Sequence, residues 1–215
     1  RGTISCIMNG EHDKNTRKKP VIVLDAGKVL VDFHLDRLMR DLSLMCGVSL
    51  SFPLPPELDA VWKALEKGCY SWGGFTSTVN RLFSVSIDAE ELRELWCGIF
   101  IGEIPGMRGV LSGLREEFTL IALSNTCDVH WTYVVDKYPI FQLLDGWVVS
   151  FEEGRLKPDP ELYRIVMHRF CGNRPPFYYT DDSSEFVDAA RKLSWNAEVF
   201  TGADQFQKEL ALRRA

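Results

Sequence analysis

The sequence predicts an α/β fold in which a parallel sheet lies between two layers of helices. Short apolar segments with the composition of buried strands alternate with segments of helical periodicity along most of the chain. This alternation favours parallel strands joined by helical crossovers that cover both faces of the sheet. The first two strands are separated by about 100 residues, whereas a crossover needs only about a dozen, so we expect an inserted lobe.

Five apolar segments have the length and the side-chain types expected of strands buried on both faces. The predicted strands cover residues 21–24, 119–123, 146–149, 177–180 and 197–200. Apolar residues at helical spacing lie between them, and the predicted helices cover residues 106–117, 129–137, 160–170 and 185–193. The sequence therefore predicts a Rossmann-like three-layer α/β core.

The insertion is predicted to be a small helical cap over the edge where the strands end. It contains helical segments such as residues 58–65 and 89–99, and nothing in it is typical of a strand of the main sheet. Its aromatic residues include Trp62 and Phe75, for which core packing is favoured over contact with a substrate. We expect a polar leader at residues 1–19, a core at residues 20–35 and 103–215, and a helical cap at residues 36–102.

Composition excludes several classes of protein. The 215-residue chain has 25 lysines and arginines, 30 aspartates and glutamates and a net charge of -5, so we expect no nucleic acid partner. Its six cysteines form no C-x-x-C pair, which argues for reduced thiols and against a zinc site. No apolar segment approaches about 18 residues and no signal-peptide pattern occurs, so we expect a cytoplasmic protein without a membrane partner. The oligomeric state is left open.

Polar residues follow the predicted strands at their carboxyl ends. Asp25 follows the first strand, Ser124 the second, and the pair Asp181 and Asp182 the fourth. Ligands of open parallel sheets bind at this edge. Two adjacent carboxylates repel each other, and a helix start needs only one acceptor, so a bound cation explains the pair better than a helix cap does.

Four short motifs resemble, in their order along the chain, those of the haloacid dehalogenase superfamily. They are Val-Ile-Val-Leu-Asp25-Ala-Gly27-Lys28, Ser124-Asn125-Thr126, Lys157-Pro158-Asp159-Pro160 and Asp181-Asp182. The resemblance extends over residues 20–201. The insertion after the first motif matches a subfamily with a helical cap, which resembles sugar-phosphate phosphatases. The resemblance therefore implies a hydrolase that binds Mg²⁺ and a small phosphorylated metabolite.

The resemblance also implies a role for each motif. Catalysis is assigned to Asp25, the nucleophile that attacks phosphorus, and to Lys157, which neutralises Asp25 and the phosphate. Substrate binding is assigned to Ser124, Asn125 and Lys157. Metal binding is assigned to Asp25, the carbonyl of Gly27, Asp181 and Asp182. These carboxylate, lysine and hydroxyl side chains suit phosphoryl transfer, because Mg²⁺ prefers oxygen ligands and the reaction needs mainly positioning and charge compensation.

The sequence departs from the family pattern at three positions, one of which is Lys28, where small or polar residues are commoner. Gly27 stands where most phosphatases of the family carry a second aspartate that protonates the leaving oxygen. Loss of a general acid and base lowers rates about 100- to 10,000-fold, although some sugar-phosphate phosphatases share this glycine. Phe186 stands where an acid or amide usually supports the metal or the lysine. With Ala190 and Leu193 it forms an apolar stripe, so we expect it to pack in the core.

We therefore predict a magnesium-dependent phosphatase that hydrolyses a small phosphate monoester, preferably a sugar phosphate, through an aspartyl-phosphate intermediate. Two alternatives stay open. A 2-haloacid dehalogenase-type hydrolase also uses an aspartate and a Ser-Asn motif but needs no metal, so the pair Asp181 and Asp182 argues against it. A weakly active or non-catalytic module of the same fold would bind a phosphorylated ligand or a protein partner.

Overall fold

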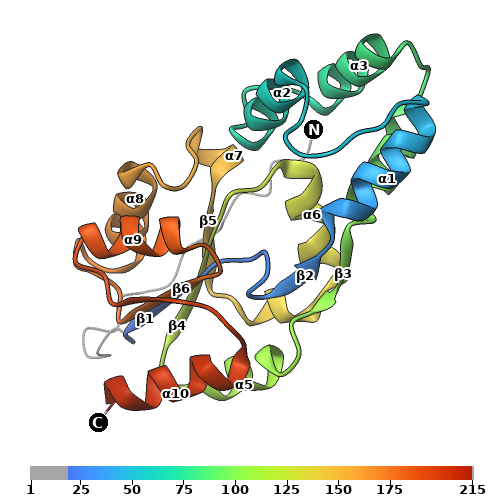
Figure 1. Ribbon diagram of the computed structural model, residues 1–215. Coiled ribbons are helices and arrows are strands. Elements are labelled where there is room, and N and C mark those ends of the chain that lie inside the picture. Colours follow the sequence, from blue (N-terminus) through green and yellow to red (C-terminus); the bar gives the residue numbers. More distant parts are fainter. Residues whose placement is uncertain (1–18, 215) are drawn as a thin grey trace, which may run out of the picture.

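A five-stranded parallel sheet forms the centre of the computed structural model, which describes residues 19–214 (Figure 1). The strands are β1 (Val21–Leu24), β4 (Thr119–Ser124), β5 (Gly146–Val149), β6 (Tyr178–Asp181) and β7 (Ala197–Val199). Their order is β5-β4-β1-β6-β7, and every neighbouring pair is parallel. The predicted α/β class with a parallel sheet is confirmed. Apart from Lys19, the predicted polar leader lies outside the described residues.

Helices cover both faces of the sheet. Alternate side chains of a strand point to opposite faces, so apolar strands such as β1 present apolar side chains on both sides that need to be covered. Ile22 and Leu24 of β1 belong to one apolar cluster, whereas Val21 and Val23 belong to another. The first cluster includes residues from α5 (Met107–Leu114), α6 (Asp128–Lys137), the 3-10 helix η1 (Pro139–Leu143) and α10 (Ala203–Arg214). The second includes residues from α8 (Pro160–Phe170) and α9 (Ser184–Lys192). Within residues 19–214, no helix is both long enough and apolar enough to span a bilayer.

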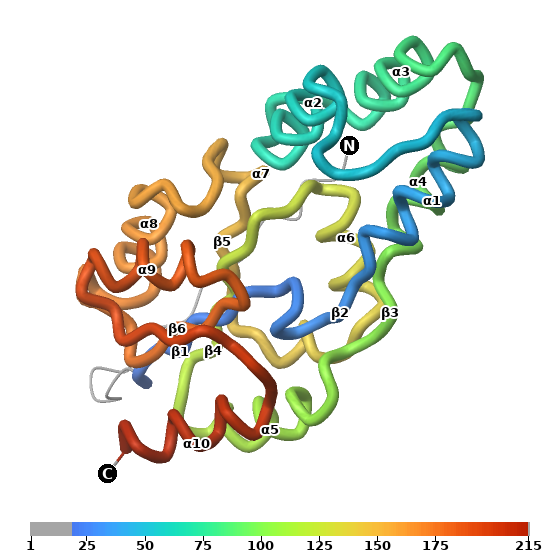
Figure 2. Tube along the Cα trace, viewed as in Figure 1, coloured from blue at the N-terminus to red at the C-terminus, as the bar shows by residue number. Residues whose placement is uncertain are grey.

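Four further helices form a cap beyond the carboxyl edge of the sheet (Figures 1 and 2). They are α1 (Leu35–Cys46), α2 (Pro56–Glu66), α3 (Trp72–Phe83) and α4 (Ala89–Cys97). Their apolar faces meet in a separate cluster, in which Leu42, Phe75 and Trp96 are almost completely buried. Cys127 and Val129 of the core belong to the same cluster, so cap and core share apolar packing. The division of the chain at residues 36–102 stays a prediction.

A short antiparallel ribbon carries the chain between the core and the cap. Strand β2 (Val31–Phe33) pairs with β3 (Phe100–Glu103), apart from the main sheet. Strand β3 begins inside the range predicted to be a helical cap but lies outside the main sheet, and the helix predicted for residues 89–99 ends at Cys97. The reason is topological. The chain leaves and re-enters the core at one place, and pairing the two segments satisfies their backbone polar groups.

A buried histidine joins the core to the cap. Nε2 of His130, on α6, donates a hydrogen bond to the carbonyl oxygen of Trp96 on α4 at 3.0 Å. The two rings stack with their centroids 5.7 Å apart. A carbonyl oxygen only accepts hydrogen bonds, so the neutral imidazole with its proton on Nε2 satisfies this contact. Burial lowers the pKa of His130 to about 4, although the hydrogen bond to Trp96 acts in the opposite direction.

His130 is expected to make the fold sensitive to acid. Its pKa rises from about 4 in the folded chain to the ordinary value of 6.5 on unfolding, so the unfolded state binds more protons between these values. The free energy of unfolding should therefore fall as the pH falls through this window, by about 2 to 3 kcal/mol at the acid end. Urea unfolding, measured at neutral pH and at a pH near 4, should show a smaller loss of unfolding free energy for His130→Gln than for wild type. Substitution of the exposed His168 by Gln is the control, and equal losses in wild type and both variants would contradict this role.

Candidate active site

The predicted site residues come together at the carboxyl edge of the sheet. Asp25 follows β1, Asp181 ends the neighbouring strand β6, and Ser124 ends β4 on the other side of β1. The backbone N–H of Asp25 donates to the carbonyl oxygen of Thr180 at 3.0 Å, which extends the pairing of β1 with β6 to this edge. Lys157 reaches the edge from the loop between α7 (Ser150–Glu153) and α8. Residues far apart in the sequence thus share one site.

The ammonium group of Lys157 connects three of these segments. Its Nζ donates hydrogen bonds to Asp25 Oδ1 at 2.7 Å, to Asp181 Oδ2 at 2.6 Å and to the carbonyl oxygen of Leu123 at 3.1 Å. An ammonium group has three donors, so its hydrogen-bonding capacity is fully used. Only 1% of the Lys157 side chain is exposed. The lysine is therefore held in one place relative to both carboxylates.

The charges of this cluster shift the pKa values of its members. Burial alone lowers the pKa of Lys157, but Asp25 and Asp181 outweigh burial, so the pKa is raised and the ammonium stays charged. Burial raises the pKa of Asp25 to about 7, with Lys157 opposing the rise and Asp181 adding to it. Burial, and then the charge of Asp181, also raise the pKa of Asp182. The cluster therefore holds more negative charge than one ammonium group balances.

Three carboxylates of the cluster are arranged as a candidate cation site. Asp25, Asp181 and Asp182 each offer an oxygen, and these oxygens lie within 4.8 Å of one another. When all three carboxyl groups are ionised, they carry two negative charges more than Lys157 balances. A divalent ion removes this excess, and Mg²⁺ favours such oxygen ligands. The carbonyl of Gly27 as a further ligand stays a prediction.

The two adjacent aspartates differ in how far their oxygens are already used. Asp181 Oδ2 accepts hydrogen bonds from Lys157 and from the hydroxyl of Tyr179, and Oδ1 accepts one from the backbone N–H of Ser183 at 2.9 Å. Asp181 is completely buried, whereas Asp182 is exposed. Asp182 is therefore the freer of the two to bind an ion. Tyr179 was not among the predicted site residues. Its place two residues before Asp181 in the sequence puts both side chains on one face of β6, which could have indicated the contact.

The second motif contributes one residue that holds Lys157 and one residue that lines a cavity. Asn125 Oδ1 accepts from the backbone N–H of Lys157 at 2.7 Å, and Asn125 Nδ2 donates to the Lys157 carbonyl oxygen at 3.0 Å. The Asn125 side chain is thus occupied, and its predicted contact with substrate would have to come from its backbone. Ser124 is buried and lines the cavity described below. Substrate binding by either residue stays a prediction.

Phe186 contacts the lysine of the site instead of the core. The centre of its ring lies 4.9 Å from Lys157 Nζ, a distance typical of a cation–π contact. Phe186 is only partly buried, whereas Ala190, one turn further along α9, is completely buried. The prediction that Phe186 packs in the core is therefore wrong. Helix α9 begins just after Asp182, so its first turn lies beside the site.

The turn after Asp25 is closed by Lys28 and Phe33. A Cβ atom at Gly27 would lie 2.8 Å from the ring of Phe33, so a larger residue fits only if the ring moves. Lys28 has a φ of 59°, a left-handed conformation that costs energy outside glycine. Its ammonium group donates to Asp32 Oδ1 at 2.6 Å and to the carbonyl oxygen of Phe33 at 2.5 Å. The hydrogen bonds of Lys28 thus stabilise the turn.

A cavity of about 130 Å³ lies between the cap and the core, next to this turn. Gly27 and Ser124 line its core side, and aromatic rings such as Trp62 and Phe100 form much of its wall. Its other polar lining residues are Glu66, Asn125, Thr126 and His130. Because it adjoins the first two motifs, this cavity is the candidate binding site for the leaving group of a substrate.

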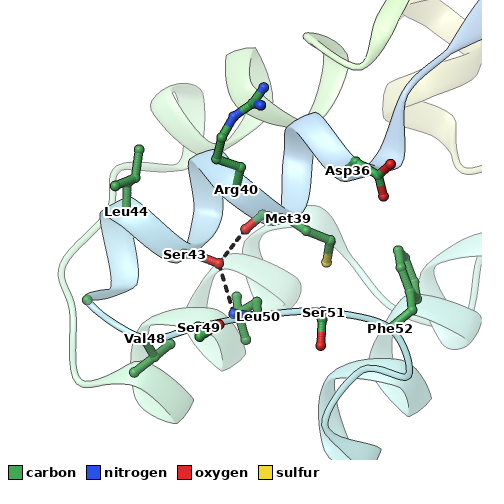
Figure 3. Close-up of a pocket in the computed structure, with 11 residues that line it drawn as sticks. Asp36, Met39, Arg40, Ser43, Leu44, Val48, Ser49, Leu50, Ser51 and Phe52 are labelled. Carbon is green, nitrogen blue, oxygen red and sulfur yellow. Dashed lines mark hydrogen bonds between the residues drawn. The ribbon is translucent and has the colours of Figure 1, made fainter.

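A larger hollow of about 850 Å³ lies on the cap, between α1 and residues 47–52 (Figure 3). Ser43 Oγ donates to the carbonyl oxygen of Met39 at 2.5 Å and accepts from the N–H of Leu50 at 2.8 Å, which holds the segment against the helix. None of the four motifs contributes to this hollow. Although this hollow is larger than the cavity between cap and core, it is not the candidate reaction site, because no motif residue lines it.

The chain is similar in sequence to two hydrolases, although no family model matches it. It is 24% identical over 218 residues to Flavin mononucleotide hydrolase 1 of Arabidopsis thaliana, with 98% of this chain and 85% of that protein covered. It is also 24% identical over 200 residues to D-ribitol-5-phosphate phosphatase of Bacteroides thetaiotaomicron, with 87% of this chain and 95% of that protein covered. Both relatives agree with the predicted class of enzyme.

The fold is similar to that of solved enzymes of the HAD (haloacid dehalogenase) family. One of them, from Bacteroides thetaiotaomicron and in complex with magnesium and inorganic phosphate, has a TM-score of 0.75 at 20% identity and covers 86% of this chain and 96% of that chain. The chain has the haloacid dehalogenase fold. A HAD-like family hydrolase from Porphyromonas gingivalis matches this HAD-like chain with a TM-score of 0.76 at 20% identity, covering 93% of this chain and 100% of that chain. The resemblance predicted from the four motifs is thereby confirmed.

Magnesium is expected to stabilise this HAD-like chain. A ligand that binds only the folded state stabilises it by about 3 kcal/mol at roughly 100 times its dissociation constant. The melting temperature should therefore rise on addition of Mg²⁺, and Asp182→Asn should reduce that rise because it removes a charged ligand. Asp136→Asn, on the exposed side of α6, is the matched control and should keep the full rise. An undiminished rise in Asp182→Asn would exclude Asp182 as a ligand.

Proposed function

We propose that the chain is a magnesium-dependent phosphatase that hydrolyses a small phosphate monoester through an aspartyl-phosphate intermediate. The observation that carries this proposal is the buried contact of Lys157 with Asp25, within a cluster of three carboxyl groups and one ammonium group. A divalent cation balances these charges, and together with Lys157 it attracts a phosphate dianion. The magnesium and phosphate complex of a HAD family enzyme with the same fold supports this assignment.

Each residue of the cluster has a role in the proposed reaction. Asp25 gives Oδ1 to Lys157 and attacks phosphorus, and the bond from phosphorus to the leaving oxygen breaks as the new bond forms. Lys157 compensates charge on the phosphoryl oxygens, and the Ser124 hydroxyl donates a hydrogen bond to one of them. Water then attacks phosphorus, which frees Asp25 and releases inorganic phosphate. Asp25 and Asp182 would hold Mg²⁺, which would supply further charge compensation when bound.

A short sugar or sugar-alcohol phosphate is the substrate class we propose. The two similar proteins are named for flavin mononucleotide and D-ribitol 5-phosphate, and both compounds carry phosphate at the end of a ribityl chain. The cavity of about 130 Å³ is smaller than the roughly 300 Å³ at which pockets for drug-sized ligands begin. An open-chain polyol therefore suits it better than a flavin ring does.

Two alternative functions differ from this proposal in their need for a cation and in turnover. A dehalogenase shares the fold, with a TM-score of 0.57 at 18% identity. Attack on carbon needs no cation, however, so dehalogenation leaves the acidic cluster without a purpose. A non-catalytic module would bind a phosphorylated ligand without releasing phosphate. Magnesium-dependent release of phosphate favours the phosphatase over both.

Replacement of the nucleophile should abolish turnover. Asp25→Asn keeps the size of the side chain but removes the charge that attacks phosphorus, so we expect kcat to fall on the order of 1,000-fold or more. Phosphate release from D-ribitol 5-phosphate, measured with Mg²⁺ and with a chelator, tests this. Asp136→Asn serves again as the control. Equal phosphate release by wild type and Asp25→Asn would refute the assignment of the nucleophile.

The size of the cavity should decide between polyol and flavin phosphates. We expect kcat/KM to be at least about tenfold higher for D-ribitol 5-phosphate than for flavin mononucleotide, because one badly fitting group costs this much. Trp62→Ala widens the cavity and should shift this ratio toward flavin mononucleotide. A wild-type preference for flavin mononucleotide would contradict the proposed substrate class.

A further inference from the structure

The proposed reaction needs a proton donor that the nucleophile turn does not contain. When the ester bond breaks, an alkyl oxygen leaves with its electron pair and needs a proton, because an alkoxide is a poor leaving group. A carboxylate two residues after Asp25 would be near that oxygen, but the position is Gly27. The ring of Phe33 fills the space that a side chain there would need. The proton must therefore come from another segment.

Among residues 19–214, the titratable side chains that line the cavity beside Gly27 are Glu66 and His130. Nε2 of His130 is engaged with the carbonyl oxygen of Trp96, and burial keeps the pKa of the imidazole at about 4. His130 therefore has no proton to spare above that pH. Within the described part of the chain, Glu66 is thus the lining residue of this cavity that can give and take a proton.

Glu66 is the last residue of helix α2 in the cap. Its Oε1 accepts a hydrogen bond from Trp62 Nε1 at 3.1 Å, and the neighbouring Lys63 forms its ion pair with Asp59 instead. Burial raises the pKa of Glu66, with the Trp62 hydrogen bond and the charge of Lys63 opposing the rise. A carboxyl group without a fixed cationic partner keeps its proton more readily than a surface glutamate does.

A close backbone contact holds this end of α2 against the core. Gly68, two residues after Glu66, has a φ of 65°, and a Cβ atom there would lie 2.1 Å from the carbonyl oxygen of Phe151. Phe151 belongs to α7, which directly follows strand β5 at the carboxyl edge of the sheet. No residue with a side chain allows this approach. The contact places the end of α2, and with it Glu66, over the cavity that Ser124 lines.

We infer that Glu66 is the general acid and base of the proposed phosphatase and takes over from the cap the role that Gly27 cannot fill. This inference rests on the proposed function. As the Asp25–phosphorus bond forms, the protonated Glu66 gives its proton to the leaving oxygen. The leaving group therefore departs as a neutral alcohol, and the phosphoryl group stays on Asp25. The Glu66 carboxylate then accepts a proton from the water that attacks phosphorus. The bond from phosphorus to Asp25 breaks, and Glu66 is protonated again.

The test compares an alkyl and an aryl phosphate in Glu66→Gln. The amide keeps the shape of the side chain and can still accept from Trp62, but it has no proton to transfer. We expect kcat/KM for D-ribitol 5-phosphate to fall about 100- to 10,000-fold. For p-nitrophenyl phosphate we expect a fall of less than about tenfold, because p-nitrophenolate leaves without a proton. Slow attack by water should also produce a burst of p-nitrophenol before steady state.

Controls separate a chemical role from a structural one. Glu91→Gln changes the same charge on the exposed side of cap helix α4 and should leave both substrates unaffected. The melting temperature of Glu66→Gln should match that of wild type, and Glu66→Ala gives the same substrate comparison should the amide disturb the fold. Equal losses on both substrates, or no loss on either, would overturn the role of Glu66.

Failure of the inference and failure of the proposed function give different results. If wild type with Mg²⁺ releases phosphate from both substrates and Asp25→Asn does not, the proposed function stands whatever Glu66→Gln does. If wild type releases no more phosphate than Asp25→Asn from either substrate, the proposed function fails, and the role of Glu66 fails with it.

Discussion

The buried contact of Lys157 with Asp25 and Asp181 is the interaction on which the rest of the site depends. Moving ions out of water costs several kcal/mol per ion, and this cost is offset only when every polar atom finds a partner. Lys157 meets this condition, because its third donor binds the Leu123 carbonyl oxygen and Asn125 pairs with both of its backbone polar groups. The contact joins the ends of three strands to one loop. The edge of the sheet is thereby made rigid where the reaction is proposed to occur.

Two aromatic rings alter the polarity around this contact. The ring of Phe33 would have to move to admit a side chain at position 27, and the ring of Phe186 lies against the ammonium group of Lys157. Phe186 stands where the family pattern has an acid or an amide, and the Phe33 ring lies next to Gly27, the other such position. Asp25 is buried, and charges interact more strongly in buried surroundings than in water. The raised pKa of Asp25 follows mainly from this burial. Neutralisation by a bound cation is therefore worth more here than at an exposed acidic cluster.

The cap is tied to the core at several points, so its residues have defined positions over the sheet. The ribbon of β2 and β3 brings both ends of the insertion together, the end of α2 rests on α7 at Gly68, and His130 bonds to α4. These contacts close the cavity between the two parts of the molecule. Because Glu66 reaches this cavity from the cap, the site combines the proposed nucleophile at the end of a strand with a polar group from a different lobe.

The sequence by itself determined the parallel sheet, the position of the insertion and the four segments at the carboxyl edge. Apolar periodicity is a local property, and in a parallel sheet the residues that end the strands must meet at one edge, so the convergence of Asp25 and Asp181 followed from topology. The tertiary structure decided that Asn125 binds the lysine backbone, that Phe186 faces an ammonium group, and that a cap glutamate lines the cavity. These features depend on how segments distant in sequence pack against one another. Such packing leaves no periodic pattern in the chain, because each contact is set by the shapes and charges of both partners.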